Sequence, residues 1–212
     1  MKKIFLLALA LIGGFLCEAQ EKKEIMLPGA NTEGGKPFME TLKDRHTSRS
    51  FTQEKLSDQQ LSNLLWAADG INRPESGKRT APSAMNNQEI DIYVCLNSGV
   101  FLYDAKKHSL NLVVEEDYRK NMGRQDFVAD APVVLLFVAD YSKMGEKISA
   151  EKKDFYSAVD VGYISQNVYL FCASENLGTV VLGSVDGNKV HEMLKLNDNQ
   201  KVLLSQCVGF PK

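Results

Sequence analysis

The spacing of apolar side chains changes its period several times along the chain. Between residues 37 and 70 the apolar positions recur with a period near 3.6, which predicts two helices. From residue 90 to residue 114 apolar and polar positions alternate, interrupted by NSG and DAKKH, so we expect three strands of an antiparallel meander. Residues 131–140, APVVLLFVAD, form a continuous apolar run, typical of a central strand buried on both faces.

Local signals sharpen the boundaries of the two helices. The first begins after Pro37, since proline suits the first helical turn, and it carries Phe38, Met39 and Leu42 on one side. The second is preceded by a capping box, which combines a serine at the N-cap with a glutamine three residues later. The residues that mark this second helix are Ser57 and Gln60 at its start, Leu61, Leu64, Leu65 and Ala68 on its apolar face, and Gly70 at its end.

The remaining segments complete an α+β pattern. Residues 71–88 and 115–130 are polar, and we expect a loop in the first and partial helix in the second. Residues 151–176 predict one long helix, apolar nearly all round in its second half and therefore buried, with Gly178 as its C′ residue.

The last segments continue this pattern. The sequence TVVLGSVDG predicts a short extended run entering a helix capped near Asp186, and KVLLSQCVGF predicts a last strand. The inner face of that helix carries Val190, Met193 and Leu194. We therefore expect a single α+β domain over residues 37–212, with a mostly antiparallel sheet sandwiched by helices.

The first residues have the composition of a secretory signal. Two lysines precede the apolar run Ile4–Leu16, and the small Ala19 follows at a suitable cleavage distance. The run is short for an uncleaved membrane anchor. Lipid attachment at Cys17 is the second alternative, disfavoured by the bulky Leu16 before it. We predict a signal peptide over residues 1–19, export after cleavage, and no integral membrane span in the mature chain.

Composition and charge narrow the classes of function that the chain can have. The formal net charge is −2, with 25% charged residues and no basic patch, which argues against nucleic-acid binding. The cysteines that remain after cleavage are odd in number and lie in apolar segments, so we interpret them as buried: Cys95, Cys172 and Cys207. No spacing indicates a metal site. Residues 20–36 are polar and contain several glycines, which is typical of an arm that can pack onto a partner subunit.

Four segments, in their order and spacing, resemble the FMN-dependent nitroreductases. With VGFP near the end, the resemblance covers nearly all of residues 41–211. It implies the fold described above, a bound FMN, and a homodimer with two sites at the subunit interface. The segments are RHTSRSF (45–51), PSAMNNQ (82–88), APVVLLFVAD (131–140), and SAVDVGYISQNVYLFCASENLGTVVLGSVD (157–186).

The resemblance assigns RHTSRSF to the phosphate and ribityl end of FMN. Arginine suits bidentate phosphate recognition, and Arg45 and Arg49 are spaced to converge on one group. His46 and Thr47 lie beside them, with a positional role for the histidine. Read alone, this segment is equally a solvated basic helix end. Family members usually continue to a further basic residue at the phosphate, a position that Lys212 can fill here.

Two further segments are assigned to the flavin ring. In the family the PSAMNNQ loop comes from the opposite subunit, with Ser83 and Asn86 hydrogen-bonding the polar edge of the ring. Glu89 replaces the usual proline after the glutamine, and we expect this to matter little. In VVLGSVD, the backbone N–H of Gly183 is assigned to flavin N5. The residues assigned to ring contacts are Pro82, Ser83, Ala84, Asn86, Leu182, Gly183 and Ser184.

The predicted activity follows from the cofactor, because no side chain is expected to be catalytic in its own right. We expect ping-pong transfer of hydride from a reduced donor, NAD(P)H by family resemblance, to a nitroaromatic, a quinone or a similar small acceptor. Two alternatives stay open: a non-redox flavin-binding or interaction protein with this fold, and a flavin oxidase or dehydrogenase for a peptide-like substrate outside the cytoplasm. The histidines His108 and His191 are expected at the surface.

Overall fold

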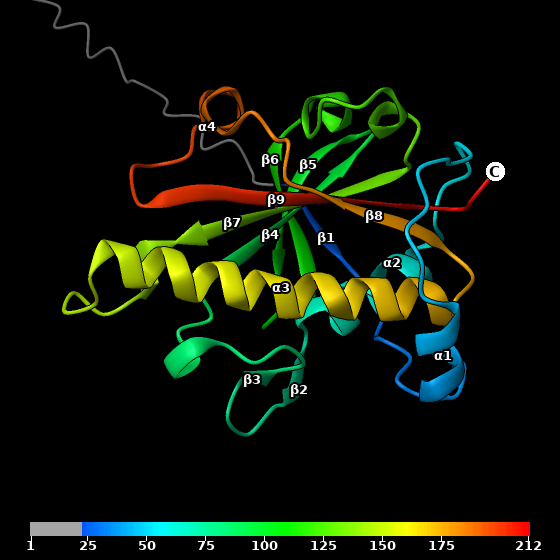
Figure 1. Cartoon of the computed structure of the whole chain (residues 1–212), viewed down its shortest axis with the longest axis horizontal. Helices are drawn as coiled ribbons and strands as arrows, with labels where there is room; N and C mark the ends of the chain where they lie inside the picture. The colour runs from blue at the N-terminus through cyan, green and yellow to red at the C-terminus, as the bar shows by residue number, and fades with distance from the viewer. Residues whose placement is uncertain (1–22) are drawn as a thin grey trace, which may run out of the picture.

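The centre of the molecule is a seven-stranded sheet in which all neighbouring strands are antiparallel (Figure 1). The computed structural model describes residues 23–212, so the predicted signal peptide and Cys17 lie outside the described residues. In spatial order the strands are β1 (Glu24–Met26), β6 (Ser109–Val114), β5 (Gly99–Asp104), β4 (Ile90–Leu96), β7 (Val133–Asp140), β9 (Gln200–Gly209) and β8 (Gly178–Leu182).

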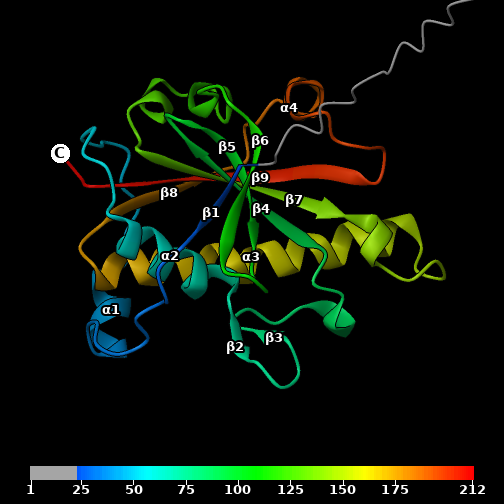
Figure 2. The same cartoon turned by 180° about the vertical axis from the view of Figure 1, so that it is seen from behind.

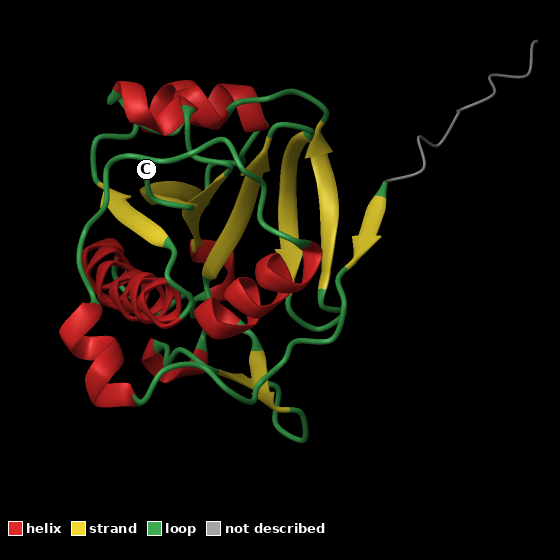
Figure 3. Ribbon diagram, turned by 90° about the vertical axis from the view of Figure 1, so that its right-hand side faces the viewer, coloured by secondary structure: helices red, strands yellow, loops and turns green. Residues whose placement is uncertain are grey.

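Helices cover both faces of this sheet (Figure 3). One face is covered by α2 (Asp58–Asp69) and α3 (Ala150–Ser174), with α1 (Phe38–Asp44) packed against α3. The other face is covered by α4 (Gly187–Leu194) and by the 3-10 segments η2 (Arg119–Asn121) and η3 (Asp126–Ala129). The α+β sandwich expected from the sequence is therefore confirmed.

The central strand β7 explains why two cores form. Because side chains alternate along a strand, Val133, Leu135 and Phe137 enter the core beneath α2 and α3. Val134 and Leu136 enter the opposite core, beneath α4. These side chains are no more than 2% exposed, which confirms the strand predicted to be buried on both faces.

Several local expectations are also confirmed. Ser57 and Gln60 form both halves of the capping box at the start of α2, and the predicted apolar face of α2 is buried. The three described cysteines are free and buried. Residues 115–130 are helical in part, through η2 and η3.

Other expectations need correction. The loop predicted over residues 71–88 contains a hairpin, β2 (Ile71–Arg73) and β3 (Lys78–Arg79), and a 3-10 turn, η1 (Ala84–Asn86). The left-handed residue after α3 is Asn176, with φ +57°, and Gly178 already begins β8. Asparagine tolerates this conformation, so glycine is not needed there.

The predicted arm lies on its own chain as far as it is described. Residues 24–26 form β1 against β6, and the Pro28 carbonyl accepts a hydrogen bond of 2.6 Å from Ser62 Oγ on α2. Figure 2 shows this segment, blue, running from β1 past α2 towards α1. Between residues 23 and 212 the structure contains no helix with the length and apolar character needed to cross a membrane.

Candidate functional site

The RHTSRSF segment follows α1 and runs beside the edge strand β8. The Ser48 N–H donates to the Thr179 carbonyl at 3.0 Å, so the segment is tied to the open edge of the sheet. A Cβ on Gly178 would lie 3.0 Å from the Ser48 side chain. The glycine in NLGT is therefore explained by this close approach of two backbones.

Tyr169 on α3 organises this edge, although the sequence did not single it out. The Arg45 guanidinium lies over its ring, 5.3 Å from the ring centroid, in a cation–π contact. Its hydroxyl bonds Thr47 Oγ1 at 3.2 Å and accepts the Val181 N–H at 3.1 Å. One side chain thus fixes both the basic segment and the end of β8. A tyrosine within the buried half of a long helix was the available signal, since a buried hydroxyl requires partners.

The end of β8 presents an unused backbone donor. The Thr179 carbonyl and the Val181 N–H both point away from β9, because they bond Ser48 and Tyr169. Continuing this alternation places the N–H of Gly183 on the same edge. Gly183 is exposed, and no partner for its N–H occurs among residues 23–212. This N–H is thus accessible to a ligand, and its assignment to flavin N5 stays a prediction.

The neighbours of Gly183 face in other directions. Leu182 is 5% exposed and packs in the core beneath α4, close to Gly123. Ser184 is half-buried, and its hydroxyl donates to Gln125 Oε1 at 3.1 Å. Ring contacts from these two side chains stay predictions.

The C-terminus lies against the basic segment. The Thr52 N–H donates to the Phe210 carbonyl at 2.8 Å, and the Lys212 N–H donates to the Ser50 carbonyl at 3.2 Å. The Lys212 ammonium pairs with Asp130 at 3.1 Å, so its reach towards a phosphate stays a prediction. His46 and Arg49 are exposed, and His46 Nδ1 lies 2.7 Å from the Asp44 carbonyl.

The PSAMNNQ segment lies elsewhere on the protomer. We call residues 82–88 the Pro82–Gln88 turn. The Ala84 N–H donates to Asp160 Oδ2 on α3 at 2.8 Å, whereas the basic segment contacts Tyr169. Nine residues of helix separate these two contacts, or roughly 13 Å along α3. Figure 1 shows the turn below one part of α3 and the chain after α1 near the other end, beside the C-terminus. The two predicted groups therefore contact separate parts of α3 within one protomer.

Glu89, which replaces the usual proline, lies inside the fold, and the expectation that the replacement matters little stays a prediction. Its side chain is fully buried, and Glu89 Oε1 accepts a hydrogen bond of 3.0 Å from Ser157 Oγ. Glu89 Oε2 is buried and has no hydrogen-bond partner among the described residues, and Asp160, one helical turn after Ser157 on α3, is 2% exposed. Burial, helped by the Glu89 charge, raises the pKa of Asp160 to about 6. A carboxyl of the segment before β4 thus lies directly beneath the predicted flavin-binding turn.

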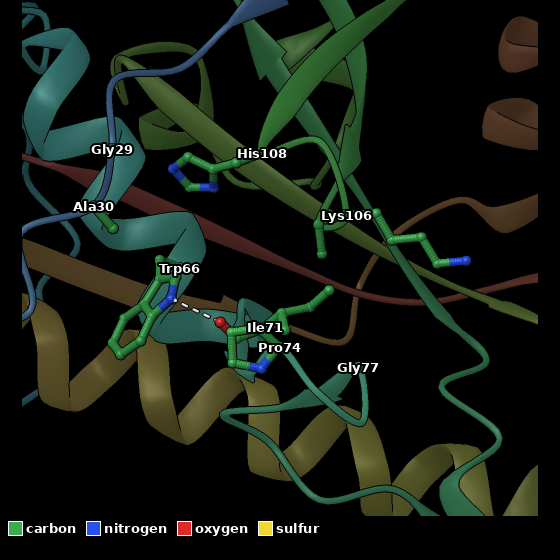
Figure 4. A pocket seen from close by; sticks show the side chains of 9 residues that line it. Gly29, Ala30, Trp66, Ile71, Pro74, Gly77, Lys106 and His108 are labelled. Atoms are coloured by element: carbon green, nitrogen blue, oxygen red, sulfur yellow. Dashed lines mark hydrogen bonds between the residues drawn. The ribbon is translucent and has the colours of Figure 1, made fainter.

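A cavity of about 580 Å³ lies at a different place, between the N-terminal segment, α2 and the β2–β3 hairpin (Figure 4). Trp66, Ile71 and Pro74 supply its apolar walls, and His108 lies at its upper side in the view. The expectation that His108 is a surface residue is wrong. Its ring is half-buried and bridges two hydroxyls, with Nε2 2.7 Å from Ser62 Oγ and Nδ1 2.9 Å from the Tyr103 hydroxyl.

Comparisons with known proteins agree with this architecture. The Nitroreductase family matches residues 42–210. A nitroreductase candidate from Methanocaldococcus jannaschii is 30% identical over 175 residues, which are 78% of this chain and 87% of the relative. The FMN reductase [NAD(P)H] of Bacillus subtilis is 27% identical over 188 residues, 82% of this chain, and the match spans only 65% of that relative.

Comparison with a solved structure shows that the similarity extends over nearly the whole fold. The crystal structure of a nitroreductase candidate from Ralstonia eutropha superposes with a TM-score of 0.85 and 40% identity, over 89% of this chain and 90% of that one. The family match spans the basic segment, the Pro82–Gln88 turn, α3 and β8, and leaves only the last two residues of the C-terminus outside it. The chain therefore belongs to the nitroreductase family of oxidoreductases.

Proposed function

We propose that the chain is an FMN-dependent oxidoreductase that acts as a homodimer, with each flavin held between two protomers. The observation that carries this proposal is the convergence of the basic segment and the Gly183 N–H at one edge of the sheet. The name of the Bacillus subtilis relative, an FMN reductase, supports the same cofactor.

The donor set at this edge fits FMN. Among residues 23–212 neither Arg45 nor Arg49 forms an ion pair, so both guanidiniums are available for a phosphate. Arg45 is held in place by Tyr169, so little of its freedom remains to be lost on binding. The exposed N–H of Gly183 can donate to N5 of the ring.

Bound FMN supplies the redox chemistry, accepting hydride from a reduced donor and passing electrons to a nitroaromatic, a quinone or a similar small acceptor. The residues of the chain bind and orient the flavin. Arg45 and Arg49 hold the phosphate, with Thr47 between them on the Tyr169 hydroxyl. Gly183 donates its N–H at the reacting edge of the ring, and Ser83 and Asn86 of a second protomer reach the polar edge.

Two exposed apolar faces support the homodimer. Phe155, Val159 and Tyr163 lie four residues apart on α3 and are 63%, 36% and 47% exposed. On α1, Phe38 and Met39 are 64% and 74% exposed. Apolar stripes of this kind are typical of protein interfaces. A second copy covering α3 would also bring a Pro82–Gln88 turn towards the other protomer's basic segment.

Export is part of the proposal. Cleavage after Ala19 would leave the described fold intact, because β1 begins at Glu24. NAD(P)H is scarce outside the cytoplasm, so an exported enzyme requires a different electron donor or acts as an oxidase or dehydrogenase. N-terminal sequencing of protein from the extracytoplasmic fraction tests cleavage, and retention of residues 1–19 in a cytoplasmic product would contradict it.

The cofactor and the activity can be tested separately. Purified protein should be yellow, or become yellow with FMN, and show flavin absorbance after gel filtration. Anaerobic titration with NADPH, NADH and dithionite, followed by nitroaromatic or quinone acceptors, then identifies the donor and acceptor classes. A protein that takes up no FMN would refute the proposal. A flavoprotein that dithionite bleaches, but that no acceptor re-oxidises, would be a flavin-binding protein and not a reductase.

A further inference from the structure

We propose that Asp160 and Glu89 are positioning residues that clamp the Pro82–Gln88 turn through one shared proton. Asp160 holds the turn directly, since its Oδ2 accepts the Ala84 N–H at 2.8 Å. Glu89 is held from the other side by Ser157, whose hydroxyl donates to Oε1 at 3.0 Å. The result is a chain of contacts from α3, through two buried carboxyls, to the backbone of the turn.

The turn needs such an anchor because its backbone is unfavourable by itself. Met85, Asn86 and Gln88 all have positive φ, between 50° and 56°, and none of them is glycine. Residues other than glycine rarely adopt this backbone conformation, and it persists only where surrounding contacts enforce it. Within the turn, Ser83 Oγ accepts the Gln88 N–H at 3.0 Å, which closes the loop but does not attach it to the fold.

The second anchor of the turn is formed by β3. The Arg79 guanidinium donates to Gln88 Oε1 at 3.1 Å and pairs with Asp69 at the end of α2. A small cavity beside the turn is lined by Asp69, Asp160 and Ser83, among others. Attachment to α3 itself is made by the Asp160–Ala84 hydrogen bond.

The proposed hydrogen bond between the two carboxyls requires a proton on one of them, because two carboxylates can only accept. Glu89 Oε2 is buried and has no hydrogen-bond partner among the described residues. Ser157, which bonds the other oxygen of Glu89, lies one helical turn before Asp160 on α3, so a protonated Asp160 can donate to Oε2 while its Oδ2 accepts from Ala84. Loss of this proton places two negative charges side by side in a buried site. The other ionisable groups around the pair are Asp69 with its partner Arg79, and Tyr141 near Glu89.

The pKa of Asp160 sets the direction in which pH changes the stability of the clamp. The folded-state pKa of Asp160 is raised to about 6, from 3.8. The clamp is therefore fully present below the ordinary pKa and is lost as pH rises through about 6. We assume that opening of the turn releases Asp160 to water, where its pKa returns to the ordinary value. The rise in pKa from 3.8 to about 6 then limits the loss of protection against exchange to roughly a hundredfold.

Amide hydrogen exchange of the flavin-free protein tests the clamp without reference to activity. After correction for intrinsic exchange, protection of a peptide covering residues 83–89 should fall between pH 5 and pH 8 in the wild type. Asp160→Asn should remove this dependence, since an amide can donate to Glu89 and accept from Ala84 at every pH. The matched control is Asp91→Asn, because Asp91 is a half-buried acid whose pKa is also raised by burial, with Lys143 as its partner 2.5 Å away.

Each outcome decides the proposal. A flat wild-type profile, or an unchanged slope in Asp160→Asn, would overturn it. If Asp160→Asn does not fold, Glu89→Gln gives the answer, because removing the Glu89 charge should move the wild-type profile to lower pH. An unmoved profile in Glu89→Gln would also overturn it.

The consequence for the cofactor rests on the proposed function. If the turn holds the flavin ring, the dissociation constant of FMN should rise with pH in parallel with the exchange rate in the wild type, and much less in Asp160→Asn. A protein that takes up no FMN would refute the proposed function and leave the exchange result standing. If amide exchange of the turn changes with pH but the dissociation constant of FMN does not, the clamp has no part in cofactor binding.

Discussion

Arg45 is held by an aromatic ring and not by a carboxylate, which leaves its charge free for a ligand. We predict that Arg45→Ala weakens FMN retention, because a charge-assisted phosphate contact contributes about 1.5–3 kcal/mol. This corresponds to roughly a 10- to 150-fold rise in the dissociation constant, measured by fluorescence titration. The matched control is Lys43→Ala on α1, which should bind FMN as the wild type does. Unchanged affinity in Arg45→Ala would remove this arginine from the phosphate site.

His108 provides a second test at the scale of one residue. Burial lowers its pKa, so the unfolded chain takes up a proton first, near pH 6.5. The stability that His108 contributes is therefore present above this pH and declines as pH falls below it. The free energy of unfolding of His108→Gln should show less of this decline than the wild type.

Urea unfolding at pH 5, 6, 7 and 8 measures this difference. The raised pKa values of Asp160 and Asp69 change stability in the opposite direction over the same range, so only the difference between variant and wild type isolates the histidine. His46→Gln is the control, because His46 is exposed. Equal pH slopes in His108→Gln and the wild type would contradict the prediction.

At the scale of elements, α2 depends on its capping box. Ser57→Ala should lower the free energy of unfolding by about 1 kcal/mol, because the side chain satisfies the Gln60 N–H at the start of the helix. Urea denaturation measures the change. Ser98→Ala, in the exposed turn between β4 and β5, should leave stability within about 0.5 kcal/mol of the wild type. A loss equal to that of Ser98→Ala would show that the box does not stabilise this helix.

Elements with local signals could be predicted, and contacts between distant segments could not. The capping box and the apolar run of β7 lie within a few residues, and both were confirmed. Strand β1 was missed because three residues of a polar arm carry no period, and only β6 makes them a strand. Glu89 could not be interpreted from sequence, because its hydrogen-bond partner Ser157 lies on another element.

The candidate site shows the same division. Its basic residues and Gly183 could be found by motif and resemblance, since the motif itself contains the chemistry. Only a weak signal, a tyrosine in a buried helix, indicated Tyr169, and none indicated Asp160, because each acts on a backbone N–H of a distant segment. Sequence patterns identify groups that face a ligand more readily than the buried groups that position them.

At the scale of the whole molecule, the two predicted halves of the site lie apart on α3, and the proposed homodimer would unite them. This makes a prediction about mixed dimers. We take a variant with Arg45→Ala and Arg49→Ala, and another with Ser83→Ala and Asn86→Ala. Each homodimer should bind FMN weakly, because each of its sites lacks one half.

A heterodimer of these two variants distinguishes shared from separate sites. If each site combines the basic segment of one protomer with the turn of the other, one site receives all the substitutions and the second is intact. The heterodimer, isolated with two affinity tags, should then bind one FMN with wild-type affinity. If each site lies within one protomer, both sites are damaged and no tight binding returns, so the flavin stoichiometry alone decides between the two arrangements.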